Sequence, residues 1–72
     1  MDVKDVFAER VYKLRAQRGL TQRELGEAIG VSHKTISTIE SALRTTSFEK
    51  LILLAKFFDV STDYLLGLKD EP

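Results

Sequence analysis

Side chains of several polar kinds gather in one short stretch of the chain. They supply hydroxyl, imidazole and ammonium groups: Ser32, His33, Lys34, Thr35 and Thr38. A lysine can donate hydrogen bonds to O6 and N7 of guanine, a histidine can donate or accept, and a threonine methyl can contact the methyl of thymine. These residues are therefore candidates for contacts with the edges of DNA bases. Taken singly, each is equally typical of a solvated helix surface.

The composition offers little for other kinds of chemistry. The 72 residues include one histidine and no cysteine, so neither a zinc centre nor a thiolate site has a ligand set. The sequence has no paired nucleophile and base and no glycine loop that would cradle a phosphate. We expect no catalysis, no metal and no cofactor, and we expect no catalytic or metal-binding role for His33.

Helix signals surround the polar stretch. Thr21 and Glu24 stand three residues apart, which is the spacing of a capping box that starts a helix. Leu25 and Ile29 give that helix a buried stripe, and Gly30 allows the left-handed turn that ends it. A first short amphipathic helix is therefore predicted directly before the polar stretch.

A second short helix follows at once. Ser32 can cap it, and Ile36 and Ile39 give it a narrow apolar face that leaves the polar residues on its other sides. Such a pair, spanning residues 21–40, is the arrangement that places a second helix in a DNA major groove. Two capped helices also occur in ordinary bundles. A close approach of the second helix would explain Gly26 inside the first, and the alternative is that glycine is simply tolerated there.

The remaining sequence is also periodic in the manner of helices, which predicts an all-α fold. Apolar spacing and capping residues predict a compact five-helix bundle, with helices at about 3–18, 22–29, 33–41, 48–58 and 62–66. A chain of this length makes one domain with one modest core. We place that domain at residues 1–68 and expect residues 69–72 to form a frayed tail.

Two helices carry most of the expected core. In the first, steps of three and four residues mark an inward stripe formed by Val3, Phe7, Val11 and Leu14. In the fourth, the corresponding stripe is formed by Phe48, Leu51, Leu54, Ala55 and Phe58.

The fourth helix has more apolar residues than one face needs. Leu53 and Phe57 are four apart and hence neighbours on a helix, outside the inward stripe. With Leu66 and Leu68 they form the predicted dimer patch, an exposed apolar surface through which two copies would associate. The alternative is that these residues wrap a small core.

Charge is balanced overall but unevenly distributed. The net charge is zero, whereas residues 10–44 hold seven basic and three acidic side chains, and the remainder carries the opposite excess. A basic part that contains the predicted second helix would orient the domain on DNA. No stretch approaches the length of a membrane span and no signal peptide is apparent, so we expect a cytoplasmic protein without a membrane partner.

The segment from about Val6 to Leu68 resembles the phage-repressor (XRE, Cro-like) helix-turn-helix family. The resemblance rests on LRAQRGLTQRELGEAIGVSHKTISTIE and on the following SFEKLILLAKFFDVSTDYLLGL. It implies a lambda-repressor-like DNA-binding domain. Ala42 and Thr46 stand where such domains commonly carry Gly and Pro, which leaves open that the second helix of the motif runs on into the following loop. Leu43 stands where many relatives have a basic residue.

The resemblance also implies roles for individual residues. Gln22 matches the phosphate-binding glutamine of the family, where the positive end of a helix dipole suits an anion. Further phosphate contacts are expected from Arg23, Ser37 and Arg44. Arg15 and Glu40 match an ion pair that joins the first helix to the second helix of the motif, and this pair is expected to be structural.

These features predict sequence-specific binding of double-stranded DNA by a homodimeric transcriptional regulator. A repressor is favoured because no activation or ligand domain is apparent, and an inverted-repeat operator follows from twofold symmetry. The alternative is a protein-interaction module, such as an antitoxin or a partner-dependent regulator. An enzyme is not expected.

Overall fold

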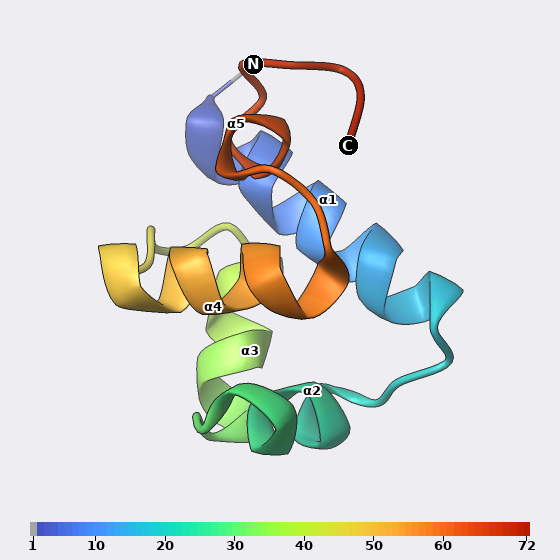
Figure 1. Ribbon diagram of the computed structural model, residues 1–72. Coiled ribbons are helices and arrows are strands. Elements are labelled where there is room, and N and C mark those ends of the chain that lie inside the picture. The colour runs from blue at the N-terminus through green and yellow to red at the C-terminus, as the bar shows by residue number, and fades with distance from the viewer. Residues whose placement is uncertain (1) are drawn as a thin grey trace.

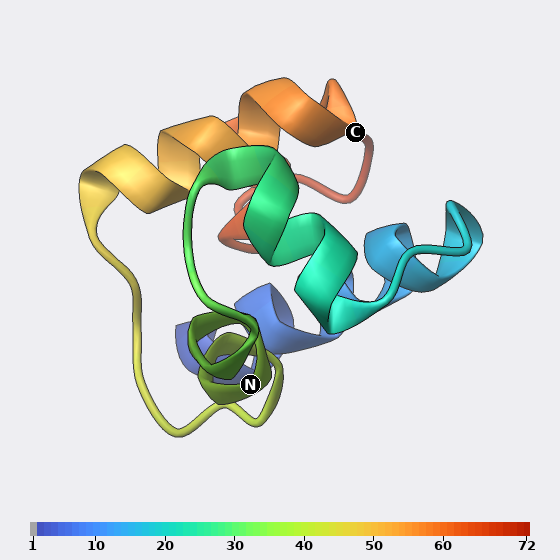
Figure 2. The same ribbon diagram turned by 90° about the horizontal axis from the view of Figure 1, so that it is seen from below.

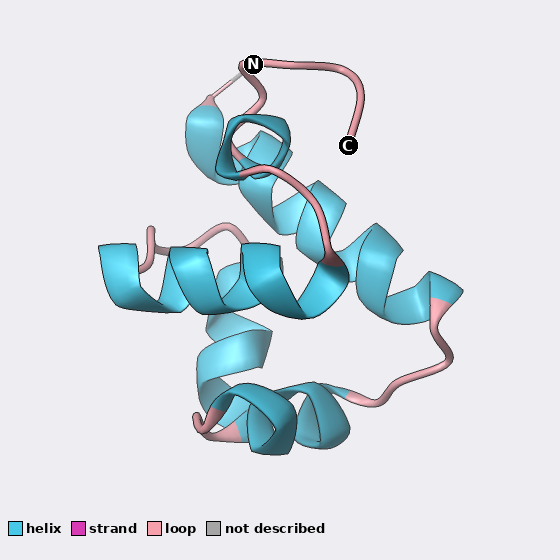
Figure 3. Cartoon of the chain, in the orientation of Figure 1, coloured by secondary structure: helices cyan, strands magenta, loops and turns pink. Residues whose placement is uncertain are grey.

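The computed structural model describes residues 2–72, and these residues form five helices and no strand. The helices are α1 (Val3–Gln17), α2 (Gln22–Ile29), α3 (His33–Glu40), α4 (Phe48–Phe58) and α5 (Thr62–Leu65). Each lies within one residue of its predicted bounds. Figure 3 shows that short loops join them. The prediction of an all-helical, five-helix domain is confirmed.

The helices divide the molecule into two ends. Figure 1 places α5 beside the start of α1 at one end, and α2 and α3 together at the other, with α4 between them. Seen from below in Figure 2, α3 is nearly end-on and the loop that follows it arcs back to the start of α4. None of the helices within residues 2–72 is long and apolar enough to cross a membrane.

Each helix begins where a side chain accepts a hydrogen bond from a free backbone N–H. The five capping residues are Asp2, Thr21, Ser32, Ser47 and Ser61. At α2 the capping box is complete, since the backbone N–H of Glu24 donates to Thr21 Oγ1 at 3.0 Å and the N–H of Thr21 donates to Glu24 Oε1 at 2.8 Å.

Two glycines set the geometry between α2 and α3. Gly30 ends α2 in the left-handed conformation, with φ of 79°, where a Cβ would be strained. Gly26 lies where α3 begins to pass over α2, and a Cβ there would stand 2.6 Å from the backbone oxygen of Val31. The predicted close approach is therefore present, and it explains a glycine inside a helix.

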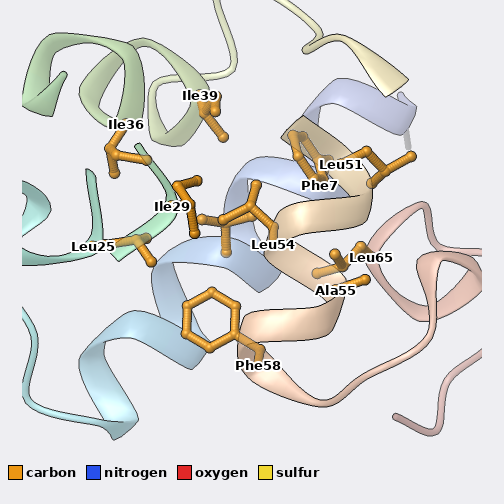
Figure 4. Close-up of a cluster of buried hydrophobic side chains, with 11 residues drawn as sticks. Phe7, Leu25, Ile29, Ile36, Ile39, Leu51, Leu54, Ala55, Phe58 and Leu65 are labelled. Atoms are coloured by element: carbon orange, nitrogen blue, oxygen red, sulfur yellow. The ribbon is translucent and has the colours of Figure 1, made fainter. Parts of the chain in front are cut away.

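The core is assembled from all five helices, as Figure 4 shows. Its largest fully buried side chains are Val11, Leu25, Ile36, Leu54 and Leu65. The predicted stripes of α2 and α3 are buried as expected, and Leu14 packs partly buried against the core.

Two residues predicted to face inward are exposed instead. Val3 is 45% exposed and Phe48 is 81% exposed. Both are the first residue of their helix, so their side chains, which lean toward the helix N-terminus, extend past the end of the helix and have no preceding turn to pack on. The spacing of apolar residues predicts which side of a helix a residue lies on, but it does not predict the exposure of the first residue.

The second helix of the motif does not run on into the following loop. α3 ends at Glu40, and Ala42 takes the left-handed conformation, with φ of 62°. Alanine thus takes a left-handed conformation at the position where the family resemblance leads one to expect glycine. The backbone N–H of Ala42 donates to the backbone oxygen of Ile39 in this turn, although alanine disfavours the left-handed conformation.

Arg10 joins the last residues to the first helix. Its guanidinium donates to the carbonyl oxygens of Tyr64 and Lys69, lies over the Tyr64 ring at 4.2 Å and stands 3.6 Å from Asp70. These contacts hold residues 64–70 beside α1. The fraying of residues 69–72 stays a prediction.

Candidate nucleic-acid interface

Four of the predicted base-contacting residues lie in α3, and the fifth, Ser32, caps its start. Ile36 and Ile39 are 0% and 3% exposed and fix the inner face of the helix against the core. On a helix with 100° between residues, Lys34 then lies almost opposite this buried face, flanked by Thr38 and by Ser37. His33, Lys34 and Ser37 are exposed, whereas Thr35 and Thr38 are half-buried.

Three hydroxyl groups on this face are already hydrogen-bonded within the helix. Ser32 Oγ accepts from the backbone N–H of Thr35 at 3.1 Å and lies 3.0 Å from Thr35 Oγ1. Thr38 Oγ1 donates to the backbone oxygen of Lys34 at 2.9 Å. Of the five predicted base-contacting residues, His33 and Lys34 are the two whose side chains make no hydrogen bond within the described residues.

A basic cleft adjoins this face. It has a volume of about 360 Å³ and lies between α3, the loop after it and the start of α4. Three cationic side chains line it: Lys34 from α3, Arg44 from the loop and Lys50 from the first turn of α4. Hydroxyl groups of threonine and serine fill the wall between them. Such a lining can hold an anion such as a backbone phosphate.

Lys50 was not among the residues predicted to contact phosphate. In the sequence it falls in the acidic part of the chain, six residues beyond Arg44. The loop after Glu40 leads to the start of α4, and the first turn of α4 forms one wall of the cleft. Lys50 therefore lines the same cleft as Lys34 of α3. A lysine in the first turn of a helix, where an acidic residue is favoured electrostatically, was the available signal.

The predicted ion pair between α1 and α3 is formed. Arg15 Nε and Nη2 donate to the two carboxylate oxygens of Glu40 at 2.6 and 2.9 Å, and Nη1 donates to the backbone oxygen of Leu20 at 2.7 Å. The side chains of Arg15 and Glu40 are only 14% and 6% exposed. The hydrogen bond and the charge of Glu40 raise the pKa of Arg15, and burial opposes the shift.

Gln22 takes part in the same network. Its Nε2 donates to Glu40 Oε1 at 3.2 Å, so one amide hydrogen is used inside the protein and one is left for another acceptor. Gln22 is the first residue of α2 and is half-buried, and Arg23 beside it is exposed. A phosphate contact by either residue stays a prediction.

The four residues of the predicted dimer patch are not equally exposed. Leu53 and Leu68 are 42% and 73% exposed, whereas Phe57 and Leu66 pack partly buried against the core. Arg18 also covers part of Phe57, since its guanidinium lies 5.3 Å from that ring and donates to the Phe57 backbone oxygen at 3.0 Å.

A second apolar surface was not predicted. It is a groove of about 340 Å³ between the start of α1, the start of α4 and α5, lined mainly by Val3, Phe7, Phe48, Leu51 and Leu66. Phe48 and Leu53 are about 140° apart around α4, so the groove and the Leu53 side of the patch face different directions. Thr45 and Thr46 line both this groove and the basic cleft.

Comparisons with known proteins agree with this geometry. A family model described as helix-turn-helix (HTH_3) matches residues 11–65. The chain is 36% identical to the uncharacterised HTH-type transcriptional regulator YobD of Bacillus subtilis, over 93% of this chain and 60% of that one. It is also 36% identical to the control protein C.SmaI of Serratia marcescens, over 99% of this chain and 88% of that one.

Among solved structures, the P22 c2 repressor in complex with a synthetic operator superposes with a TM-score of 0.82. It is 33% identical in sequence and the match covers 88% of this chain and 96% of the repressor chain. Several of the other relatives are longer, and the chain spans about half to three fifths of their length.

Proposed function

The chain belongs to the helix-turn-helix (XRE) family, and from that premise we propose that it regulates transcription by binding double-stranded DNA sequence-specifically through α3. The family match also agrees with the prediction that the chain is not an enzyme. Its place of action would be the cytoplasm, where bacterial DNA lies.

The outer face of α3 is the observation that carries this proposal. A short helix held by Ile36 and Ile39 turns His33 and Lys34 outward, beside a cleft lined by three cationic side chains. Side chains of α3 that contact the edges of bases would supply sequence preference, and the cationic side chains beside α3 would contact phosphates and so fix the position of the duplex. We assign the base contacts to Ser32, His33, Lys34, Thr35 and Thr38.

Phosphate contacts would come from both sides of the helix. Arg44 and Lys50 lie at the cleft, whereas Gln22 and Arg23 lie at the start of α2. Ser37 is exposed on the outer face of α3 and completes the predicted set. The chain as a whole is neutral, so affinity depends on these local cations.

We propose a homodimer that acts as a repressor at an inverted repeat. One protomer offers one α3, and two such helices about 34 Å apart would fit successive major grooves. Two apolar surfaces could join the protomers: the groove beside Phe48, and the predicted patch of Leu53, Phe57, Leu66 and Leu68.

The groove is the better fit to a twofold contact. Phe48 projects beside a hollow lined by Leu51 and Leu66, so Phe48 of each protomer can enter the groove of the other. The shared lining residues Thr45 and Thr46 would also set the second protomer next to the basic cleft.

Sedimentation separates the two surfaces. Phe48→Glu should convert a dimer to a monomer, whereas the double variant Leu53→Glu, Phe57→Glu should leave the mass unchanged. The reverse result would return the dimer contact to the predicted patch. Because Phe48 is exposed, its substitution should not unfold the domain.

Selection against a randomised duplex pool near 100 mM salt tests the proposed function. Enrichment of an inverted repeat with half-sites one helical turn apart supports a dimeric operator-binding regulator. Binding that merely weakens as salt rises, with no enriched sequence, would contradict it. The alternative of a protein-interaction module, which the apolar groove would serve, would then be favoured.

A further inference from the structure

Thr38 differs from the other polar residues of α3 in the group it can present. Its hydroxyl donates its single proton to the backbone oxygen of Lys34 at 2.9 Å. The oxygen therefore faces the helix, and the second substituent on Cβ, the methyl group, is left for whatever approaches the outer face. Thr38 lies about 50° from the direction opposite the buried face.

The neighbouring hydroxyls are committed in a different way. Ser32 Oγ caps α3 by accepting from the backbone N–H of Thr35, and it lies 3.0 Å from Thr35 Oγ1. Ser32, Thr35 and Thr38 all line the basic cleft. Ser32 has no methyl group. Among these three residues, Thr38 combines a bound hydroxyl with a position one turn from Lys34 on the outward face.

We propose that Thr38 is a specificity-determining residue that contacts the C5-methyl group of a thymine in the major groove. The proposal rests on the proposed DNA-binding function and assigns one base to one side chain. The major-groove edge of thymine carries that methyl beside a single acceptor, O4, and apolar contact with the methyl is an established way to recognise it. A threonine whose only proton is already used favours the methyl over O4.

The spacing of α3 adds a second element to the half-site. Lys34 and Thr38 are four residues apart, so their Cβ atoms are about 6 Å apart. Successive bases of one strand are about 3.4 Å apart along the duplex. If Lys34 donates to a guanine, the thymine at Thr38 lies within about two base-pair steps of that guanine.

Uracil substitution tests this assignment directly. Uracil lacks only the C5-methyl of thymine and keeps the same base pairing. In the selected operator, each thymine is replaced by uracil in turn, and dissociation constants are measured. We expect one position per half-site to weaken binding about fourfold, the effect of one buried methyl group, and about fifteenfold when both half-sites are changed.

Two variants assign that position to Thr38. Thr38→Val keeps a methyl and removes the hydroxyl, so it should retain the sensitivity to uracil. Thr38→Ser keeps the hydroxyl and removes the methyl, so it should bind the thymine operator about fourfold more weakly per half-site and lose the sensitivity. Thr62→Ser in α5, at the far end of the molecule, is the matched control and should behave as the parent protein.

The outcomes separate this inference from the proposed function. If an operator is selected but no uracil weakens binding, or if Thr38→Ser stays as sensitive to uracil as the parent, the methyl contact is wrong while DNA binding stands. If no operator is selected, the proposed function fails and this inference fails with it. Circular dichroism melts of each variant report whether the fold is intact.

Discussion

Glu40 is the residue at which three segments of the chain meet. Its carboxylate accepts two hydrogen bonds from Arg15 of α1 and one from Gln22 of α2, and it is the last residue of α3. A planar guanidinium binds a carboxylate with two fixed hydrogen bonds, which a lysine cannot reproduce. The tilt of α3 is therefore fixed by side-chain geometry at its end as well as by the core.

At this scale, Arg15→Met should destabilise the domain before it changes sequence preference. Loss of one partner leaves the buried Glu40 carboxylate uncompensated, which costs roughly 3 kcal/mol and lowers the melting temperature by roughly 15 °C in a domain of this size. Thermal melts measure the effect, with Arg23→Met as an exposed control. Unchanged melting together with a lost sequence preference would contradict a structural role.

The stability that Arg15 contributes through this pair should not change as the pH is raised through the neutral and mildly alkaline range. The pKa of Arg15 is raised, so its contribution to stability is fully present below the ordinary arginine pKa and is lost only at strongly alkaline pH.

At the scale of elements, the helices are defined by their ends. Five capping side chains start them, and left-handed residues terminate α2 and α4 and form the turn after α3. Two of these left-handed residues are Gly30 and Asp59. Glycine adopts the left-handed conformation without strain, and aspartate adopts it more readily than most other residues. Ala42 is the strained member of the set.

Ala42→Gly should therefore stabilise the domain. Relief of the left-handed alanine outweighs the extra freedom that glycine gains in the unfolded chain, for a net gain of about 0.5–1 kcal/mol. Ala28→Gly, an exposed position inside α2, should instead lose about 1 kcal/mol. Chemical denaturation of both variants measures the two effects, and a loss of stability in Ala42→Gly would show that the turn does not strain alanine.

At the scale of the whole molecule, charge and shape separate into two ends. The end that carries α2 and α3 contains the basic cleft, whereas the opposite end carries the start of α1, α5 and the last residues, which include most of the acidic side chains. A neutral molecule built in this way presents one attractive face to DNA and weak attraction elsewhere.

Lys50→Gln should weaken DNA binding with little dependence on sequence. Each phosphate contact contributes about 0.9 to the slope of log affinity against log salt, so the slope should fall by about one per protomer. Lys56→Gln removes the same charge from the same helix outside the cleft and is the control. Equal effects of the two variants would mean that only net charge matters and that the cleft holds no phosphate.

Much of the fold was predictable because the signals were local. The capping box at Thr21, the turn at Gly30 and the paired isoleucines of α3 each act over a few residues, and the five helices match their predicted bounds. The Arg15–Glu40 pair was implied by family resemblance and is present in the structure. The base and phosphate contacts remain predictions.

The sequence by itself determined the helices, their caps and the polar face of α3, since these depend on residues within one or two turns of each other. Only the tertiary structure decided which surfaces exist. The loop after α3 places Lys34 and Lys50 in the lining of one cleft, and the ends of α1, α4 and α5 enclose the groove beside Phe48. Each of these depends on contacts between segments far apart in the chain, and helical periodicity carries no information about them.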